Sequence, residues 1–108
     1  MPLTRSFKTT VQARAARDPA FREALLQEAV QALLGGDTAT GRAVLRDYIN
    51  ATVGFDKLAK ATRTPAKSLM RMFGPRGNPQ AKHLMTVLDA LQRVTGVKLE
   101  VRAVRKAA

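Results

Sequence analysis

The stretch Phe55–Phe73, "FDKLAKATRTPAKSLMRMF", decides the fold that this sequence predicts. Its first half, up to Thr62, places its apolar side chains on one face at helical spacing. Its second half predicts another short helix that begins at Pro65, with Thr64 as its N-cap. Only a short turn separates the two. A pair of short helices joined by a turn of three or four residues is typical of the helix-turn-helix arrangement.

The second of these helices has two chemically different faces. Leu69, Met72 and Phe73 recur at a spacing of three and four, and we expect them to point into the core. Polar and basic side chains follow the same spacing on the opposite side. A helix that enters the major groove of DNA must be half core and half ligand surface, which explains this interleaving. The predicted base-reading residues are Thr64, Lys67, Ser68, Met70 and Arg71.

The segment 63–82 holds five Lys or Arg residues and no acidic residue. After the second helix, the loop "GPRGNP" leads to a long helix that we expect to open at Pro79, with Asn78 as its cap. The free N–H groups at the start of such a helix suit a phosphate. The predicted phosphate-binding residues are Lys57, Lys60, Arg63, Arg76, Asn78, Lys82 and His83.

The whole chain of 108 residues fits a single domain with a modest hydrophobic core. Its net charge of +11 is unusual and points to a polyanionic partner, because such a charge repels itself in a folded protein. The charge is uneven: residues 1–17 carry +4, residues 18–50 carry −2 and residues 51–108 carry +9. We therefore interpret the middle of the chain as a scaffold and expect the two ends to contact the partner.

The remaining segments complete a mainly α fold, a bundle of five or six helices that contains a Cro/repressor-type helix-turn-helix. We expect a basic arm or helix over 1–17, a helical scaffold over 18–52 and the DNA-binding core over 54–96. Asp18 and Pro19 start the best-signalled scaffold helix, and Asp37 or Thr38 caps the next one.

The C-terminal part, 97–108, predicts a short β-strand followed by a tail. In "VKLEVRAV" apolar and polar residues alternate strictly, which is the strand pattern. A lone strand needs a partner for its backbone groups. One hypothesis is that Val97, Leu99 and Val101 form a dimer contact with a second copy. The alternative is that the strand pairs with the N-terminal arm of its own chain.

The sequence also argues against several classes of protein. With no cysteine there is no disulfide framework and no thiol chemistry, which suits the cytoplasm. No signal peptide or transmembrane stretch is evident. Binding to a membrane surface would favour aromatic and apolar residues beside the cations on one helix face, which the basic segments do not offer, so no membrane role is expected. The single histidine, His83, lacks the partners that a metal site or a catalytic base needs, and the acidic residues are scattered. We therefore expect neither an enzyme nor a cofactor or metal.

Four segments carry a resemblance to a known family: "GFDKLAKAT", "SLMRMFGPRGNP", "LMTVLDAL" and "GVKLEV". From about Asp18 to Val101 the chain resembles the addiction-module antidote proteins, which are Cro/phage-repressor-type (Xre-like) helix-turn-helix regulators. The resemblance implies an antitoxin-like repressor that occupies an operator, often its own, and that binds a RelE/ParE-like toxin. By the same resemblance, Lys67, Ser68 and Arg71 align with the base-reading part of the recognition helix.

Other functions stay open at the level of the sequence. The same architecture also occurs in stand-alone regulators without a toxin. A basic interaction protein that binds RNA or acidic proteins is a second class, although RNA binding would favour exposed aromatic side chains. The basic segment 1–17 has three readings: an arm along DNA phosphates, a helix packed on the scaffold, or a toxin-binding surface. Within it, Phe7 and Val11 favour packing, whereas a phosphate role is favoured by Arg5, Lys8, Arg14 and Arg17.

Overall fold

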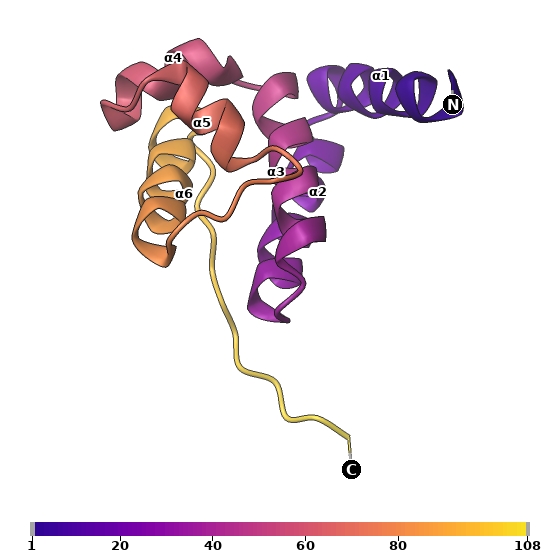
Figure 1. Ribbon diagram of the computed structural model, residues 1–108. Helices are drawn as coiled ribbons and strands as arrows, with labels where there is room; N and C mark the ends of the chain where they lie inside the picture. Colours follow the sequence, from indigo (N-terminus) through magenta and orange to yellow (C-terminus); the bar gives the residue numbers. More distant parts are fainter. Residues whose placement is uncertain (1, 108) are drawn as a thin grey trace.

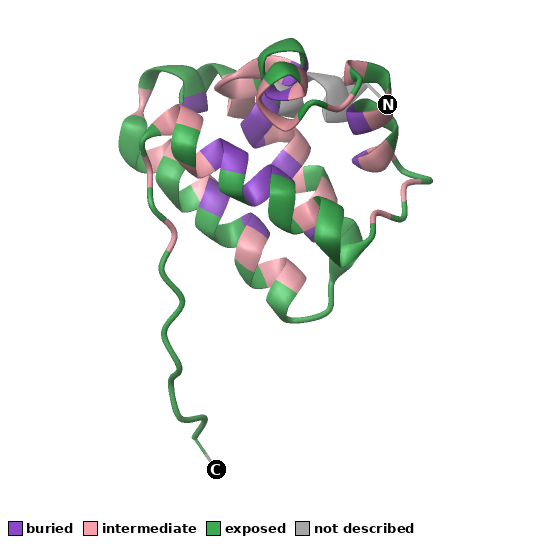
Figure 2. Cartoon of the chain, turned by 90° about the vertical axis from the view of Figure 1, so that its left-hand side faces the viewer, coloured by how far each residue is buried: buried purple, intermediate pink, exposed green. Residues whose placement is uncertain are grey.

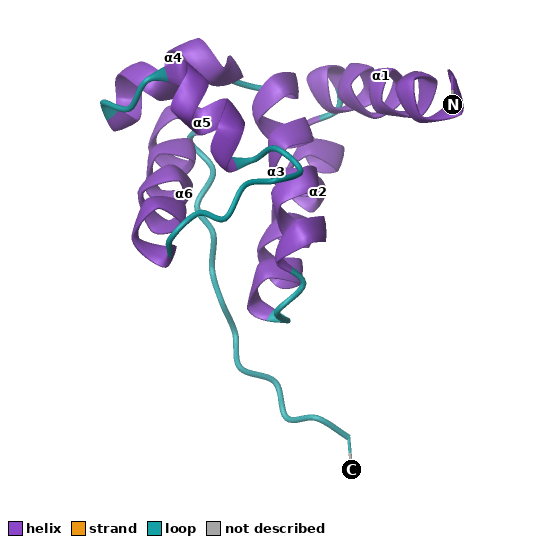
Figure 3. Ribbon diagram, viewed as in Figure 1, coloured by secondary structure: helices purple, strands orange, loops and turns teal. Residues whose placement is uncertain are grey.

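The computed structural model describes the backbone of residues 2–107 and the side chains of residues 10–107. The predicted roles of Arg5, Phe7 and Lys8 therefore lie outside the described side chains. Within 2–107 the chain forms six helices and no strand (Figures 1 and 3). This confirms the mainly α fold. The helices are α1 (Pro2–Arg17), α2 (Pro19–Leu34), α3 (Thr38–Ala51), α4 (Gly54–Thr62), α5 (Ala66–Met72) and α6 (Ala81–Thr95).

The scaffold is the pair α2 and α3, and its helix ends follow the expected caps. The Asp18 carboxylate accepts the Phe21 N–H at 3.2 Å, with Pro19 in the first helical position. The Asp37 carboxylate accepts the Thr40 N–H at 3.2 Å in the same way. The two helices pack closely at Gly41, where a Cβ atom would collide with the Leu33 side chain. A larger residue there would push the pair apart.

The hydrophobic core joins this scaffold to the three later helices. Leu26 of α2 and Leu45 of α3 are fully buried, and so are Leu58 of α4 and Leu91 of α6. Figure 2 shows the buried parts of the chain gathered where the helices face one another, with exposed residues on the outer surfaces. Helix α1 reaches away from this core at the N-terminal end (Figure 1), and its Ala15 is buried where it meets the scaffold.

The predicted C-terminal strand is not present in the described chain. Residues 97–107 instead run as an extended segment away from the helices, as Figure 3 shows. The physical reason is that a strand requires a second backbone, and within residues 2–107 no other segment has strand structure to pair with. The expected alternation nevertheless appears at the start of the segment, because Val97 and Leu99 pack against the core while Lys98 and Glu100 are exposed.

Two helix starts differ from the sequence prediction. Helix α5 begins at Ala66, and Pro65 precedes it without a side-chain cap. The Thr64 hydroxyl is used differently, because it donates to the Thr62 carbonyl oxygen at 3.2 Å. Helix α6 begins at Ala81 rather than Pro79, because Gln80 is still extended with φ −72° and ψ 153°.

Candidate nucleic-acid interface

The turn between α4 and α5 is three residues long, 63–65, and it ends α4 sharply. Arg63 has a φ of 55°, and it is the one described residue other than glycine with a positive φ. This left-handed conformation lets the Thr64 N–H donate to the Ala59 carbonyl oxygen at 3.1 Å, which closes the end of α4. Glycine is the usual residue in this left-handed position, so the backbone of Arg63 is strained. The Arg63 side chain is exposed to solvent.

Helix α5 has the two faces that its sequence predicts. Leu69 is only 1% exposed, and Phe73, which directly follows the helix, is 2% exposed. The Phe73 ring packs against the ring of Phe55 in α4, with centroids 6.4 Å apart. On the other side Lys67 and Arg71 are exposed. The buried face therefore fixes the orientation of the helix, and the basic face remains available to a partner.

A shallow hollow brings several predicted residues together on that outer side. It lies between α5, the loop 74–80 and the start of α6. Ser68, Arg71, Arg76, Asn78 and His83 all line it. This part of the predicted set therefore forms one continuous surface, in which groups from the base-reading set and the phosphate-binding set are neighbours.

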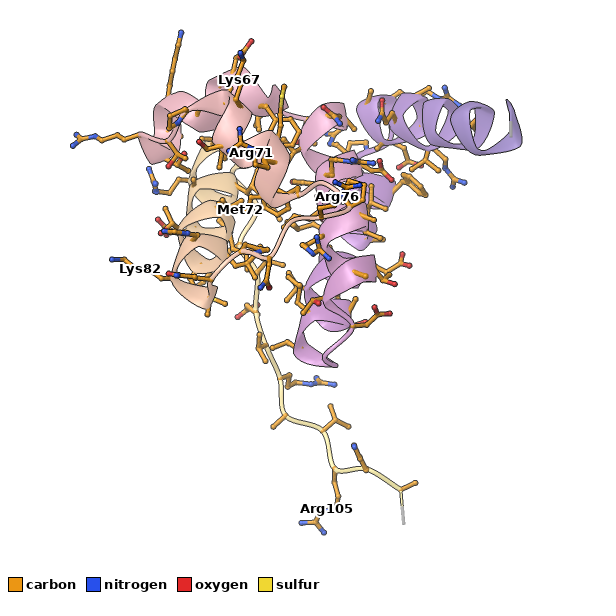
Figure 4. All side chains as sticks on the ribbon, viewed as in Figure 1. Lys67, Arg71, Met72, Arg76, Lys82 and Arg105 are labelled. Atoms are coloured by element: carbon orange, nitrogen blue, oxygen red, sulfur yellow. The ribbon has the colours of Figure 1, made fainter. Side chains whose placement is uncertain are left out.

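A smaller and less open hollow of about 280 Å³ adjoins the first, because both are lined by Ser68, Met72 and His83. Thr62, Thr64 and Thr86 add three hydroxyl groups to its wall. Thr64 and Ser68 are each half-buried, so they are less available than Lys67. Figure 4 shows Lys82 on α6, extending outward from the helix into solvent.

Other predicted residues lie elsewhere. Lys57 lines a separate hollow together with Glu23 of α2 and Val97 of the C-terminal segment. Met70 is 50% exposed and lines a hollow with Gln12 of α1 and Arg46 of α3, on the side of α5 that faces the scaffold. Lys60 is exposed on α4 but lines neither of the hollows beside α5.

Two contacts fix the loop that carries Arg76, and the sequence analysis missed both. Nη1 of Arg42 in α3 donates a hydrogen bond of 2.8 Å to the Gly74 carbonyl oxygen. Gly77 lies so close to the end of α5 that a Cβ atom would collide with the carbonyl oxygens of Arg71 and Met72. Helical spacing from the buried Leu45 gives the only sequence signal for Arg42, and it does not identify the partner.

The cations of this surface have no carboxylate partner among the side chains of residues 10–107. The two ion pairs described there are Arg14–Asp18 at 3.7 Å and Arg93–Asp89 at 3.0 Å, both between residues four positions apart in the chain. Lys67, Arg71 and Arg76 belong to neither pair. A positive surface that its own chain does not neutralise attracts a polyanion from solution.

Within the described residues, no group of three or more His, Cys, Asp or Glu side chains is placed to hold a metal ion. In the same part of the chain, none of the helices has the length and apolar character needed to cross a bilayer.

Comparison with known proteins returned no match: no family model, no curated protein and no solved structure matches this chain.

Proposed function

We propose that this chain is a sequence-specific DNA-binding protein that represses transcription by occupying an operator. In this proposal α4 and α5 act as a helix-turn-helix, and α5 lies in the major groove. The observation that carries the proposal is the division of α5 into a buried face at Leu69 and an exposed basic face at Lys67 and Arg71. Repression of this kind requires no chemistry, only occupancy of a promoter.

The surrounding surface supports a division of labour between contacts. Arg71 is suited to guanine, which it can bind through two parallel hydrogen bonds. Arg76, Lys82 and the N–H groups at the start of α6 are suited to phosphates on either side. Because the loop that holds Arg76 is bonded to α3, these phosphate contacts would set the register of α5 in the groove.

The resemblance to addiction-module antidote proteins extends the proposal. We infer an antitoxin-like regulator in the cytoplasm that acts on its own operon as a homodimer, with a RelE/ParE-like toxin as a further partner. A stand-alone regulator without a toxin is the alternative within the same class. These statements rest on the four sequence segments and on the basic face of α5.

A binding titration tests the central claim. DNA from the region upstream of the protein's own gene is compared with scrambled DNA of the same length at physiological salt. We expect a preference of about a thousandfold or more for the upstream DNA. Equal and steeply salt-dependent binding to both would contradict the proposal, since it would identify a general polyanion surface. The search would then turn to RNA or to acidic proteins as partners.

A further inference from the structure

The C-terminal segment carries apolar side chains that its own chain leaves uncovered. In Figure 1 the segment runs between α6 and α2 and then away from the helices. Val97 and Leu99 pack against the core, whereas Val101 and Val104 are 74% and 72% exposed. Single exposed valines are common on protein surfaces. Here, however, Val101 continues the alternation begun by Val97 and Leu99, which indicates an extended backbone ready for pairing.

One edge of this extended backbone is already occupied. The Leu99 N–H donates to Oε1 of Gln92 in α6 at 2.8 Å, and the Val97 N–H donates to the Thr95 hydroxyl at 3.4 Å. In an extended chain the backbone groups of successive residues point to opposite edges. The odd-numbered residues therefore bond toward their own helices. The other edge, which carries the N–H and C=O groups of Lys98, Glu100 and Arg102, has no hydrogen bond within residues 2–107.

We propose that this open edge pairs with the same segment of a second copy of the chain. The two segments would run antiparallel around a two-fold axis at Val101. The inference deepens the proposed function, since it specifies the contact of the homodimer on which operator binding would rely. The N-terminal arm is the alternative partner, but it is helical over Pro2–Arg17 and so offers no strand edge.

Charge excludes one of the nearby registers. Pairing through the even-numbered edge allows the two-fold axis to pass through residue 99, 100 or 101. An axis at Glu100 would set this carboxylate against its own copy and Lys98 against Arg102 of the second copy. Like charges placed directly opposite each other destabilise a sheet. An axis at Leu99 or Val101 instead sets Glu100 against a cation.

Packing decides between the two remaining registers. Leu99 is already packed against its own core, so an axis there would force the second segment into the helical body. Moving the axis to Val101 shifts the partner by four residues, about 14 Å along the strand, and clear of the helices. In this register Glu100 of each copy lies opposite Arg102 of the other, which gives two such pairs. Val101 lies opposite Val101 of the second copy, and Leu99 lies opposite Ala103.

The surface beside the segment supplies cover for such a ribbon. A two-stranded ribbon is only marginally stable by itself and needs a hydrophobic surface to rest on. Leu34, at the end of α2, is 66% exposed and lines a hollow of about 490 Å³ together with Val101 and Val104. The dimer would cover Leu34 and Val101, which are among the most exposed large apolar side chains that the structure describes.

Charge reversal tests the register, with the full-length protein and without DNA. We expect Glu100→Arg alone and Arg102→Glu alone each to raise the dimer dissociation constant about tenfold or more, measured by analytical ultracentrifugation. The double variant Glu100→Arg/Arg102→Glu restores the opposite charges and should return the constant close to that of the wild type. Glu28→Arg, an equal change of charge on the exposed side of α2, serves as the matched control and should leave it unchanged.

Cysteine cross-linking tests the position of the axis independently. Because the chain contains no cysteine, Val101→Cys would be its only thiol. Under mild oxidation we expect Val101→Cys to form a disulfide-linked dimer, since the two side chains face each other at a non-hydrogen-bonded pair. Val104→Cys is equally exposed but faces Lys98, and should remain largely monomeric on a denaturing gel.

Several results would overturn the inference. A wild-type protein that sediments as a monomer at high concentration would do so, as would equal cross-linking at both cysteines. A double charge variant that dimerises no better than the single variants would reject the register. None of these measurements involves DNA, so their failure is separate from a failure of the proposed operator binding.

Discussion

Arg42 and Gly74 connect the scaffold to the predicted DNA-binding surface: Nη1 of Arg42 donates a 2.8 Å hydrogen bond to the Gly74 carbonyl oxygen, 32 positions later in the chain. Gly74 directly follows Phe73, the C-cap residue of α5. A cation at this point also interacts favourably with the unsatisfied carbonyl groups at the end of a helix. This single bond thus holds both the end of α5 and the loop that begins there.

We expect Arg42→Ala to destabilise the fold by about 1 kcal/mol, because a partly buried carbonyl loses a charged donor. For a domain of this size the midpoint of thermal unfolding should fall by roughly 4–8 °C. The affinity for operator DNA should fall further than stability alone explains, since the loop carrying Arg76 is no longer fixed. Differential scanning calorimetry and a DNA titration well below the unfolding temperature measure the two effects.

Arg46→Ala is the matched control for this experiment. Arg46 lies one turn further along α3, is likewise half-buried, and lines the hollow beside Met70 rather than the loop 74–80. Its removal should change the unfolding temperature less than the removal of Arg42. Equal losses of stability from both variants would show that the bond to Gly74 has no special role.

The relation between Arg42 and Gly74 also shows where sequence reasoning stops. Local signals predicted the cap at Asp18, a cap at Asp37 or Thr38, and the buried face of α5, because each depends on residues within one or two helical turns. A hydrogen bond across 32 positions has no such signal. The division of α5 into faces was therefore predictable, while the anchoring of the loop behind it was not.

The C-terminal strand illustrates the opposite case. The alternation in 97–103 is a true local pattern, and it is visible in the burial of Val97 and Leu99. The prediction of a strand was wrong for the single chain, because strand formation depends on a second backbone that residues 2–107 do not provide. Local sequence specifies which face of such a segment is apolar, but the pairing partner must come from tertiary or quaternary structure.

Arg63→Gly separates stability from DNA affinity at the turn. Because Arg63 adopts a left-handed conformation with φ 55°, glycine should relieve strain and stabilise the fold by about 0.5–1 kcal/mol. The same change removes a predicted phosphate contact, so binding should weaken on all DNA sequences and the salt slope should fall by about one. Chemical denaturation and titrations at several salt concentrations measure the pair of effects. A variant that is both less stable and unchanged in affinity would contradict this account.

Asp37 gives the α3 cap a dependence on pH. Hydrogen bonds from the side chain and the backbone N–H of Thr40 hold the pKa of Asp37 below its ordinary value of 3.8. A carboxyl with a depressed folded-state pKa stabilises the protein above its unfolded-state pKa, and this contribution is lost as the pH falls through the folded value. Asp37→Asn keeps a capping side chain without the charge.

We therefore expect wild type to be more stable than Asp37→Asn at pH 7, with the difference shrinking as the pH falls below about 4. Urea denaturation at pH 7 and at pH 3 measures this difference in stability. Glu28→Gln removes a carboxylate from an exposed position of α2 and controls for the general change in charge. A difference that stays constant between pH 7 and pH 3 would mean that the charge of Asp37 contributes nothing to the cap.

Two arginines, Arg71 on α5 and Arg76 in the loop, line the same hollow. If Arg71 reads a base, Arg71→Ala should lose discrimination at one base pair, worth roughly 1–3 kcal/mol. The preference for particular bases at the other positions of the operator should not change. If Arg76 binds phosphate, Arg76→Ala should weaken binding to all sequences similarly and reduce the salt slope by about one. Titrations on an operator and its single-base variants, each at several salt concentrations, separate the two patterns.

Arg93→Ala provides the control for the loss of one positive charge, because Arg93 lies in the last turn of α6 and pairs with Asp89. Its effect on affinity and on the salt slope should be small compared with that of Arg76→Ala, since it lies outside the hollow beside α5. Identical losses on every DNA sequence from Arg71→Ala and Arg76→Ala would reject the assignment of separate roles. The surface would then hold DNA by charge alone, because a side chain that contacts only phosphates carries no direct information about sequence.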